Sequence, residues 1–201
     1  MFIVVDGPNG SGKTTLIKNL RQLGVKTLSS PSATELSSML RPACRGTDKW
    51  SNLDKYVKFF LFSAARMDEY IKLVHNKKEI IVADRWWTST FVYQCMYENI
   101  PVETLEATIH PDEKIDMVVL LDCDDDILID RINKDRASDP KHGRCTWTQT
   151  SESIIKLANI YRNEIKAFLA SRGIKYCVLN TSSFNEEEVV ERFNDIIKSL
   201  N

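Results

Sequence analysis

The sequence predicts a three-layer α/β fold, in which a five-stranded parallel sheet is covered by helices on both faces. Short apolar runs alternate with longer amphipathic segments along all 201 residues, which is typical of strand–helix–strand units and a parallel sheet. Some runs are apolar at nearly every position, as in Val118-Val119-Leu120-Leu121, which suits strands buried on both sides. No repeat, low-complexity tract or linker interrupts the chain, so we expect one domain over residues 1–201 with a lid segment.

The first expected strand, Phe2–Asp6, runs directly into a glycine-rich motif. Residues Gly7 to Thr14 fit G-x-x-x-x-G-K-[ST], and a helical spacing of apolar residues follows. Such a loop wraps an anionic phosphate with backbone N–H groups, and the helix N-terminus behind it adds partial positive charge. We expect Lys13 to reach the β- and γ-phosphates of a nucleotide, and Thr14 to offer its hydroxyl to Mg²⁺.

The second expected strand, Val25–Ser29, leads into a polar loop. Ligands of open α/β sheets bind beyond the carboxyl ends of the strands, so this loop is a place to look for contacts. Pro31 ends the strand, and Thr34 can cap a short helix that continues through Leu40. By composition alone this is an ordinary loop.

The longest expected helix spans Asn52–Asn76. On it, Phe62 and Arg66 are four residues apart and therefore share a face. An aromatic ring beside a guanidinium can stack on a base and donate hydrogen bonds to its edge. Spacing alone favours a simpler interpretation, in which Phe62 belongs to the core and Arg66 pairs with an acid.

The third expected strand, Ile80–Asp84, ends in an acid that is followed by Arg85. A carboxylate at a strand tip near a phosphate loop can hold the shell of Mg²⁺ or orient an attacking oxygen, and arginine can bind a phosphate with two parallel hydrogen bonds. The next helix carries Ser89, Thr90 and Tyr93 on overlapping faces. Core packing is the simpler explanation for Tyr93, and capping for Thr88.

After the fourth expected strand, Met117–Asp122, three aspartates are expected to form the acidic first turn of a helix. A basic segment punctuated by glycine and proline follows, and it suits either a lid over phosphates, at about residues 135–150, or a solvated loop. Its basic residues are Arg131, Lys134, Arg136, Lys141 and Arg144. The fifth expected strand is Tyr176–Asn180.

The composition limits the classes of function. A formal net charge of −1 argues against a broad nucleic-acid-binding surface, and no apolar run approaches the roughly 20 residues of a membrane span. The five cysteines are odd in number, scattered and never arranged as C-x-x-C, which indicates reduced thiols. The three histidines show no ligand spacing. Because the first strand is expected at residue 2, we expect no signal peptide and a cytoplasmic protein.

Several motifs in the right order resemble the thymidylate kinase family of P-loop nucleoside monophosphate kinases. Besides the loop Gly7–Thr15, Leu61-Phe62-Ser63-Ala64-Ala65-Arg66 is similar to L-F-[SA]-A-[ND]-R. Asp84-Arg85-Trp86 with Ser89 and Tyr93-Gln94 is similar to D-R-Y-x-x-S-x-x-A-Y-Q, and Leu121-Asp122 leading to Arg131 and Arg136 resembles the family's strand, helix and lid entry. The resemblance covers nearly the whole chain. It implies a P-loop kinase fold, Mg²⁺ with ATP as donor, and phosphorylation of a deoxynucleoside 5′-monophosphate, foremost dTMP to dTDP.

The resemblance also implies a homodimer, formed through the long helix and the one after it, and roles for single residues. The implied ATP-binding residues are Gly7, Asn9, Gly10, Ser11, Gly12, Lys13, Thr14 and Thr15, with Arg131 and Arg144 near the lid. The implied acceptor-binding residues are Pro31, Phe62 under the base, Arg66 at its edge, Ser89 and Thr90 beside it, Tyr93 at the deoxyribose and Arg85 at the phosphate. The implied catalytic residues are Lys13, Asp84, Arg85 and Arg136, with Thr14 and Asp84 at the metal. Some relatives carry an arginine at the position of Gly10, so here the lid would supply that charge.

Three departures from the family pattern concern the acceptor. Asn9 replaces an acidic residue, Ser29–Thr34 replaces R-E-P-G-G-T, and Trp86 replaces a tyrosine. They leave alternatives open: a deoxynucleoside, a modified dUMP such as 5-hydroxymethyl-dUMP, or a modified base in DNA. A nucleoside would need an acid to activate its hydroxyl, and DNA would need a basic track, which the net charge disfavours. A non-catalytic nucleotide-binding module is disfavoured because Lys13, Thr14 and Asp84 are all present.

Overall fold

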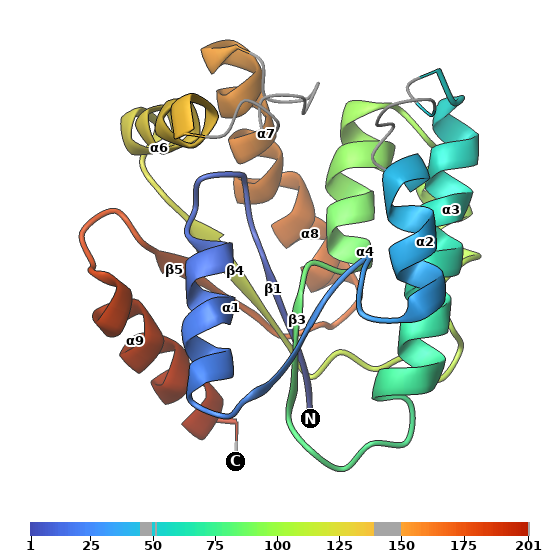
Figure 1. Ribbon diagram of the computed structural model, residues 1–201, viewed down its shortest axis with the longest axis horizontal. Coiled ribbons are helices and arrows are strands. Elements are labelled where there is room, and N and C mark those ends of the chain that lie inside the picture. The colour runs from blue at the N-terminus through green and yellow to red at the C-terminus, as the bar shows by residue number, and fades with distance from the viewer. Residues whose placement is uncertain (45–49, 51, 139–149, 201) are drawn as a thin grey trace.

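The computed structural model describes residues 1–44, 50, 52–138 and 150–200. Over these ranges, five parallel strands form one sheet in the order β2-β3-β1-β4-β5 (Figure 1). The strands are β1 (Phe2–Asp6), β2 (Lys26–Ser29), β3 (Ile81–Asp84), β4 (Met117–Asp122) and β5 (Tyr176–Asn180). The expected α/β fold and its five strands are confirmed, although β2 and β3 each begin one residue later than predicted.

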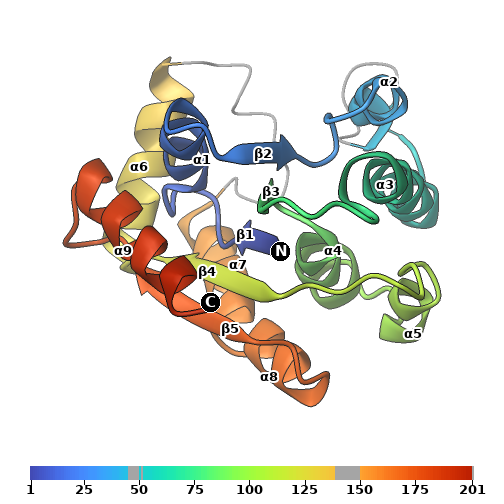
Figure 2. The ribbon, with the colours of Figure 1, turned by 90° about the horizontal axis from the view of Figure 1, so that it is seen from below.

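Helices cover both faces of the sheet, as Figure 2 shows in a view from below. In β1, Ile3 and Val5 pack with α1 and α9, whereas Phe2 and Val4 face α4, α7 and α8 on the other side. Each strand therefore contributes apolar side chains to two cores, as its continuous apolar sequence predicts. The helices are α1 (Lys13–Gln22), α2 (Glu35–Cys44), α3 (Lys55–Glu69) with the π-helix η2 (Tyr70–Val74), α4 (Trp87–Thr90) with the π-helix η3 (Phe91–Tyr97), α5 (Val102–Glu106), α6 (Asp125–Ser138), α7 (Ser151–Arg162), α8 (Glu164–Ser171) and α9 (Glu186–Lys198).

Two helix boundaries differ from those expected. The long helix begins at Lys55 and not at Asn52, because the side chain of Asp54 caps it by accepting a hydrogen bond from the N–H of Tyr56 at 2.8 Å. Conversely, α2 continues past Leu40 to Cys44. Thr34 caps this helix as predicted, since its Oγ1 accepts from the N–H of Ser37 at 3.1 Å.

The expected lid is only partly described. Helix α6 begins with Asp125 and Asp126, which confirms the acidic first turn, and it ends at Ser138. The rest of the lid, with Lys141 and Arg144, lies outside the described residues. Among the helices of the described ranges, none is both long and apolar enough to cross a membrane.

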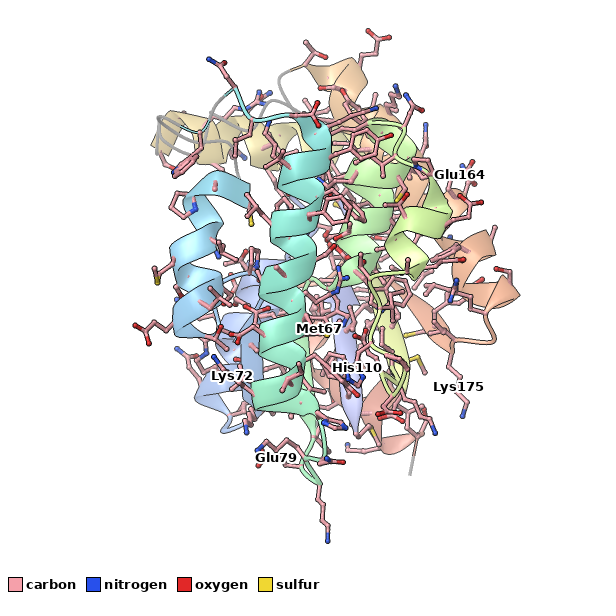
Figure 3. The ribbon with its side chains drawn as sticks, turned by 90° about the vertical axis from the view of Figure 1, so that its right-hand side faces the viewer. Met67, Lys72, Glu79, His110, Glu164 and Lys175 are labelled. Carbon is pink, nitrogen blue, oxygen red and sulfur yellow. The ribbon has the colours of Figure 1, made fainter. Side chains whose placement is uncertain are left out.

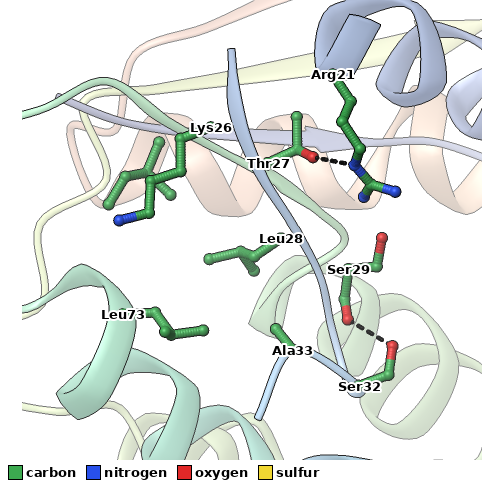
Figure 4. A pocket seen from close by; sticks show the side chains of 9 residues that line it. Arg21, Lys26, Thr27, Leu28, Ser29, Ser32, Ala33 and Leu73 are labelled. Carbon is green, nitrogen blue, oxygen red and sulfur yellow. Dashed lines mark hydrogen bonds between the residues drawn. The ribbon is translucent and has the colours of Figure 1, made fainter. Parts of the chain in front are cut away.

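A hollow of about 440 Å³ lies along the outer edge of β2 (Figure 4). Leu28, Ala33 and Leu73 contribute its apolar lining. Arg21 also lines it, and its Nε donates to Thr27 Oγ1 at 3.0 Å. Because β3 separates β2 from β1 in the sheet, this hollow is distinct from the loop that follows β1.

Candidate active site

The glycine-rich loop between β1 and α1 is packed against β4 at Gly7, where a side chain would not fit, and against α6 at Gly10, where a side chain would make a tight contact. At Gly7, where φ is 148°, a Cβ atom would lie 2.2 Å from the carbonyl oxygen of Leu121 in β4. At Gly10, where φ is 81°, it would lie 3.1 Å from the carbonyl oxygen of Leu128 in α6. Helix α6 therefore fills the direction in which an arginine at position 10 would leave the loop.

Lys13 lies folded into this loop. Its Nζ donates to the carbonyl oxygens of Gly7 at 2.8 Å and Pro8 at 2.7 Å. Burial, and then the nearby Arg85 cation, lower the pKa of Lys13 to about 7, against the opposing effect of Asp6 and Asp84. An anion that enters the loop would restore the charge that burial disfavours.

Thr14 and Asp84 are the two side chains assigned to a metal by resemblance. Thr14 is exposed on the first turn of α1, and Asp84 ends β3. Oδ1 of Asp84 is buried and has no hydrogen-bond partner among the described residues. Burying an unpaired carboxylate oxygen is costly, and hard divalent cations prefer oxygen ligands. These two residues therefore fit a divalent cation.

Arg85, directly after β3, is held from several elements. Its backbone is left-handed, with φ at 66°. Its Nη2 donates to Oδ1 of Asn9 in the glycine-rich loop at 2.7 Å, and its Nη1 donates to Ser89 Oγ at 3.0 Å. The guanidinium carbon lies 5.5 Å from the centre of the Tyr93 ring. The structure thus brings four of the expected site residues together beside the loop.

Asp6 lies at the centre of this arrangement, and the sequence did not single it out. It is completely buried, and its carboxylate accepts hydrogen bonds from the Gly7 N–H at 2.8 Å, from Ser89 Oγ at 2.8 and 2.9 Å, and from Thr88 Oγ1. Nη1 of Arg85 lies 3.5 Å from its Oδ1. Thr88 therefore bonds to a carboxylate and makes no side-chain cap. Asp6 ends a strand as Asp84 does. The rule that ligands bind beyond the carboxyl ends of parallel strands would therefore also have indicated Asp6.

Tyr161 of α7 also donates to Asp6. Its hydroxyl donates to Asp6 Oδ1 at 2.8 Å and lies 3.5 Å from Arg85 Nη1. Burial, and then the Asp6 carboxylate, raise the pKa of Tyr161 well above its usual value, so the phenol remains a donor. Tyr161 is 155 residues from Asp6 in the chain, and no local pattern indicates the contact.

The other expected acceptor-binding residues lie on α3 and α4. Phe62 is half-buried, whereas Thr90 is 5% exposed. Arg66 is 3% exposed and donates through Nη2 to the carbonyl and hydroxyl oxygens of Thr108, at 3.2 and 3.1 Å. The structure therefore directs Arg66 at Thr108, a residue that the sequence pattern did not single out.

The loop that contains Pro31 is held by two helices. Nη1 of Arg41 in α2 donates to the Pro31 carbonyl at 3.0 Å and to Ser32 Oγ at 2.7 Å. Oε1 of Glu69 in α3 accepts from the N–H groups of Ser32 and Ala33, at 2.8 and 2.9 Å. Glu69 therefore fixes the backbone of this loop from α3.

The three arginines expected near the lid differ in where they lie in the structure. Arg131 donates through Nη1 to the carbonyl of Gly10 and to Thr181 Oγ1, both at 3.1 Å, so it ties the glycine-rich loop to the segment after β5. Arg136 lies in the last turn of α6, and Arg144 lies outside the described residues.

Trp86, one of the departures from the family pattern, is a core residue. The Trp86 ring packs edge-on against Phe2, with ring centres 5.1 Å apart, and its Nε1 donates to Glu113 Oε1 at 2.7 Å. It is 2% exposed. Trp86 thus lies in the core, and its ring is linked to the expected acceptor-binding residues through Glu113, whose carboxylate also acts on Arg66.

A glycine-rich loop holding a lysine, beside an acid and an arginine at the tip of a neighbouring parallel strand, defines a P-loop phosphotransferase. A family model described as thymidylate kinase matches residues 5–180. The chain belongs to the thymidylate kinase family, which uses ATP with a divalent metal to phosphorylate dTMP. The expected kinase activity and fold are thereby confirmed.

Individual relatives agree with this family. The chain is 26% identical to the probable thymidylate kinase of Methanosphaera stadtmanae over 175 residues, which cover 83% of this chain and 88% of that protein. It is 28% identical to the probable thymidylate kinase of Sulfurisphaera tokodaii, with coverage of 99% and 96%. A crystal structure of thymidylate kinase from Ehrlichia chaffeensis has a TM-score of 0.70 and covers 98% of both chains at 18% identity, which shows a common fold.

Proposed function

We propose that this chain transfers the γ-phosphoryl group of Mg²⁺-bound ATP to the 5′-phosphate of dTMP, with the two nucleotides meeting between Lys13 and Arg85. The observation that carries this assignment is the 2.7 Å hydrogen bond from Arg85 Nη2 to Asn9 in the loop. This bond supports the proposal, because it holds an arginine that is suited to bind a phosphate directly beside the glycine-rich loop. The loop side suits the donor, and the Arg85 side suits the acceptor.

The chain's own residues would supply alignment and positive charge. Lys13 and Arg85 neutralise charge on the phosphates, and Thr14 and Asp84 would hold Mg²⁺. The bound cation would offset negative charge that develops on the transferred group. The acceptor phosphate is already an anion, so Asn9 need not act as a base. Phe62, Arg66, Ser89, Thr90, Tyr93 and Pro31 would line the base and sugar, and Arg136 and Arg144 would approach the phosphates from the lid.

A coupled assay of ADP release tests the assignment. With ATP and Mg²⁺ in excess, we expect dTMP to give the highest kcat/KM in a panel that also contains dUMP, dCMP, dGMP, dAMP and thymidine. Turnover of thymidine but not of dTMP would instead indicate a nucleoside kinase. The absence of ADP release with every acceptor in the panel would contradict the proposed reaction.

Tyr161→Phe tests whether the buried network positions Arg85. The variant loses the hydroxyl that donates to Asp6, so we expect KM for dTMP to rise about fivefold while KM for ATP stays constant. Steady-state kinetics with each substrate varied in turn measure this split. Tyr70→Phe is the matched control, because it removes another buried hydroxyl, which bonds to the Asp112 carbonyl at 2.9 Å. Equal KM changes for both substrates would contradict the positioning role.

We also propose that the enzyme is a homodimer joined through the outer face of α3. Figure 3 looks onto this side, where α2 and α3 run side by side. Val57 and Phe60 are 45% and 53% exposed there, three residues apart on one side of α3, and Ile71 of η2 is 53% exposed. Met39 of α2 adds a side chain that is 71% exposed. Exposed apolar patches of this kind mark contact surfaces.

Phe60→Glu is expected to convert the dimer to a monomer, because a carboxylate in the middle of an apolar contact would be buried without a partner. Light scattering coupled to size exclusion measures the mass. Leu23→Glu is the control, since Leu23 is 64% exposed at the end of α1, away from this face. A dimeric mass that persists in the Phe60 variant would locate the contact elsewhere.

The free thiols of Cys44, Cys95, Cys123 and Cys177 support a reducing, cytoplasmic compartment.

A further inference from the structure

The last turn of α7 carries two neighbouring residues that hold the ends of two different strands. Tyr161 donates to Asp6 at the end of β1, and Arg162 donates to Asp122 at the end of β4. Successive residues of a helix point about 100° apart, so the two side chains can reach different strands. Among the described contacts, only those of Tyr161 belong to the network around Arg85. Arg162 therefore serves another part of the molecule.

The guanidinium of Arg162 donates from each of its nitrogens. Nε lies 3.1 and 3.0 Å from the two carboxylate oxygens of Asp122, and Nη1 donates at 2.7 Å to Oδ1 of Asp125 in the first turn of α6. Nη2 donates to the Cys123 carbonyl at 2.7 Å. Because the guanidinium is planar and rigid, it holds these groups in one relative arrangement. Arg162 thus fixes the start of α6 against the end of α7, and Figure 1 shows the two helices next to each other.

Helix α6 carries this arrangement to the glycine-rich loop. The Leu128 carbonyl faces Gly10 closely, since a Cβ atom on Gly10 would lie 3.1 Å from that oxygen. From the same helix, Nη1 of Arg131 donates to the Gly10 carbonyl at 3.1 Å. A displacement of α6 would therefore displace the backbone of the loop at Gly10.

A second route from Arg162 to the loop passes through Asp122. Its carboxylate is held by Arg162, while its backbone carbonyl accepts from the N–H of Thr181 at 2.9 Å. Thr181 Oγ1 donates in turn to the carbonyl of Ser11 in the loop at 3.1 Å. Thr181 and Ser11 are both buried, so close packing leaves these contacts little freedom to adjust. Both routes end on the glycine-rich loop.

We propose that Arg162 is a positioning residue for the ATP side of the site, acting on the glycine-rich loop through α6 and Thr181. The inference rests on the proposed function, in which this loop binds the donor phosphates and Arg85 binds the acceptor phosphate. Adjacent residues of α7 then serve different substrates: Tyr161 orients Arg85 for dTMP, and Arg162 sets the loop for ATP. A displacement of about 1 Å caused by a distant residue can lower a rate about a hundredfold, so such a role has a measurable effect.

Arg162→Met tests this role. Methionine keeps an apolar stem but removes every donor, so we expect KM for ATP to rise about tenfold while KM for dTMP stays constant. Tyr161→Phe should show the opposite split. Arg162→Lys keeps the charge without the planar fork, so it should recover only part of the loss. Isothermal titration calorimetry with ADP measures donor-site affinity without turnover, and this affinity should fall by the same factor as KM for ATP rises.

Arg172→Met is the matched control. Arg172 also pairs with a carboxylate, that of Glu106, and the side chains of Arg172 and Arg162 are 33% and 24% exposed. This variant should change neither KM. Circular dichroism shows whether each variant is folded. If Arg162→Met does not fold, Asp125→Ala replaces it, because it leaves the contact between Arg162 and β4 in place and removes only the Asp125 carboxylate on α6; KM for ATP should then rise about threefold.

The outcomes separate this inference from the proposed function. An unchanged KM for ATP in the folded variant would overturn the inference, and so would an equal rise in both KM values, which indicates a general structural role. A rise confined to dTMP would also contradict it, because Arg162 would then act on the acceptor side. If the wild type releases no ADP with any acceptor, the proposed reaction fails, whereas calorimetry with ADP still decides whether Arg162 positions the loop.

Discussion

Replacing Lys13 with methionine is expected to lower kcat about a thousandfold. The ammonium lies inside the glycine-rich loop, where it donates to the carbonyl oxygens of Gly7 at 2.8 Å and Pro8 at 2.7 Å and lies 3.5 Å from Ser11 Oγ. Those contacts can be exchanged for the phosphates of ATP, where the charge stabilises the transition state; removing one such preorganised donor costs about a hundredfold to a thousandfold. The coupled assay with saturating dTMP measures kcat directly.

The methionine variant should remain folded. Methionine fills a similar volume, and it removes a cation whose burial lowers its own pKa to about 7. Circular dichroism and the thermal midpoint provide the check, and Lys18→Met provides the control, because Lys18 lies on the exposed side of the same helix. A variant that keeps more than about a tenth of wild-type kcat would remove Lys13 from the chemistry.

The sequence predicts those features that depend on nearby residues. The β-branched run Phe2–Asp6 is a strand whatever surrounds it, and the motif from Gly7 to Thr14 carries its own backbone requirements. The same holds for the acidic start of α6 and the cap at Thr34. Helix α3 is less well predicted at its ends, because its start depends on one side-chain hydrogen bond to Asp54 and the chain continues after Glu69 as the π-helix η2.

Contacts between distant segments are what the sequence could not supply. The Tyr161–Asp6 bond joins α7 to β1, and the Glu69 bonds join α3 to the loop after β2. Neither pair has a characteristic spacing, since each forms only when the sheet order brings the segments together. Trp86 shows the converse: it follows Arg85 directly in the chain, yet its ring lies in the core, where it contacts Phe2 and Glu113. Proximity in sequence was there a poor guide to proximity in space.

Arg85→Ala is expected to reduce kcat/KM for dTMP about a thousandfold while KM for ATP changes little. The guanidinium forms the acceptor side of the proposed site, and its two nitrogens are already oriented by Asn9 and Ser89. A phosphate can therefore be bound by a fork that needs no reorganisation, which is the condition for a large effect on phosphoryl transfer. Kinetics with dTMP varied at saturating ATP measure the loss.

Arg85→Lys separates charge from shape at this position. Lysine keeps the positive charge but cannot donate to two oxygens in one plane. We therefore expect it to recover only part of the lost kcat/KM, about tenfold above the alanine variant. Arg172→Ala is the control for removing an arginine, because Arg172 pairs with Glu106 and is partly exposed in the segment after α8. If lysine restored full activity, charge alone would account for Arg85. The network built on Asp6 and Tyr161 would then serve stability and not orientation, since a flexible ammonium gains little from being held at a fixed angle.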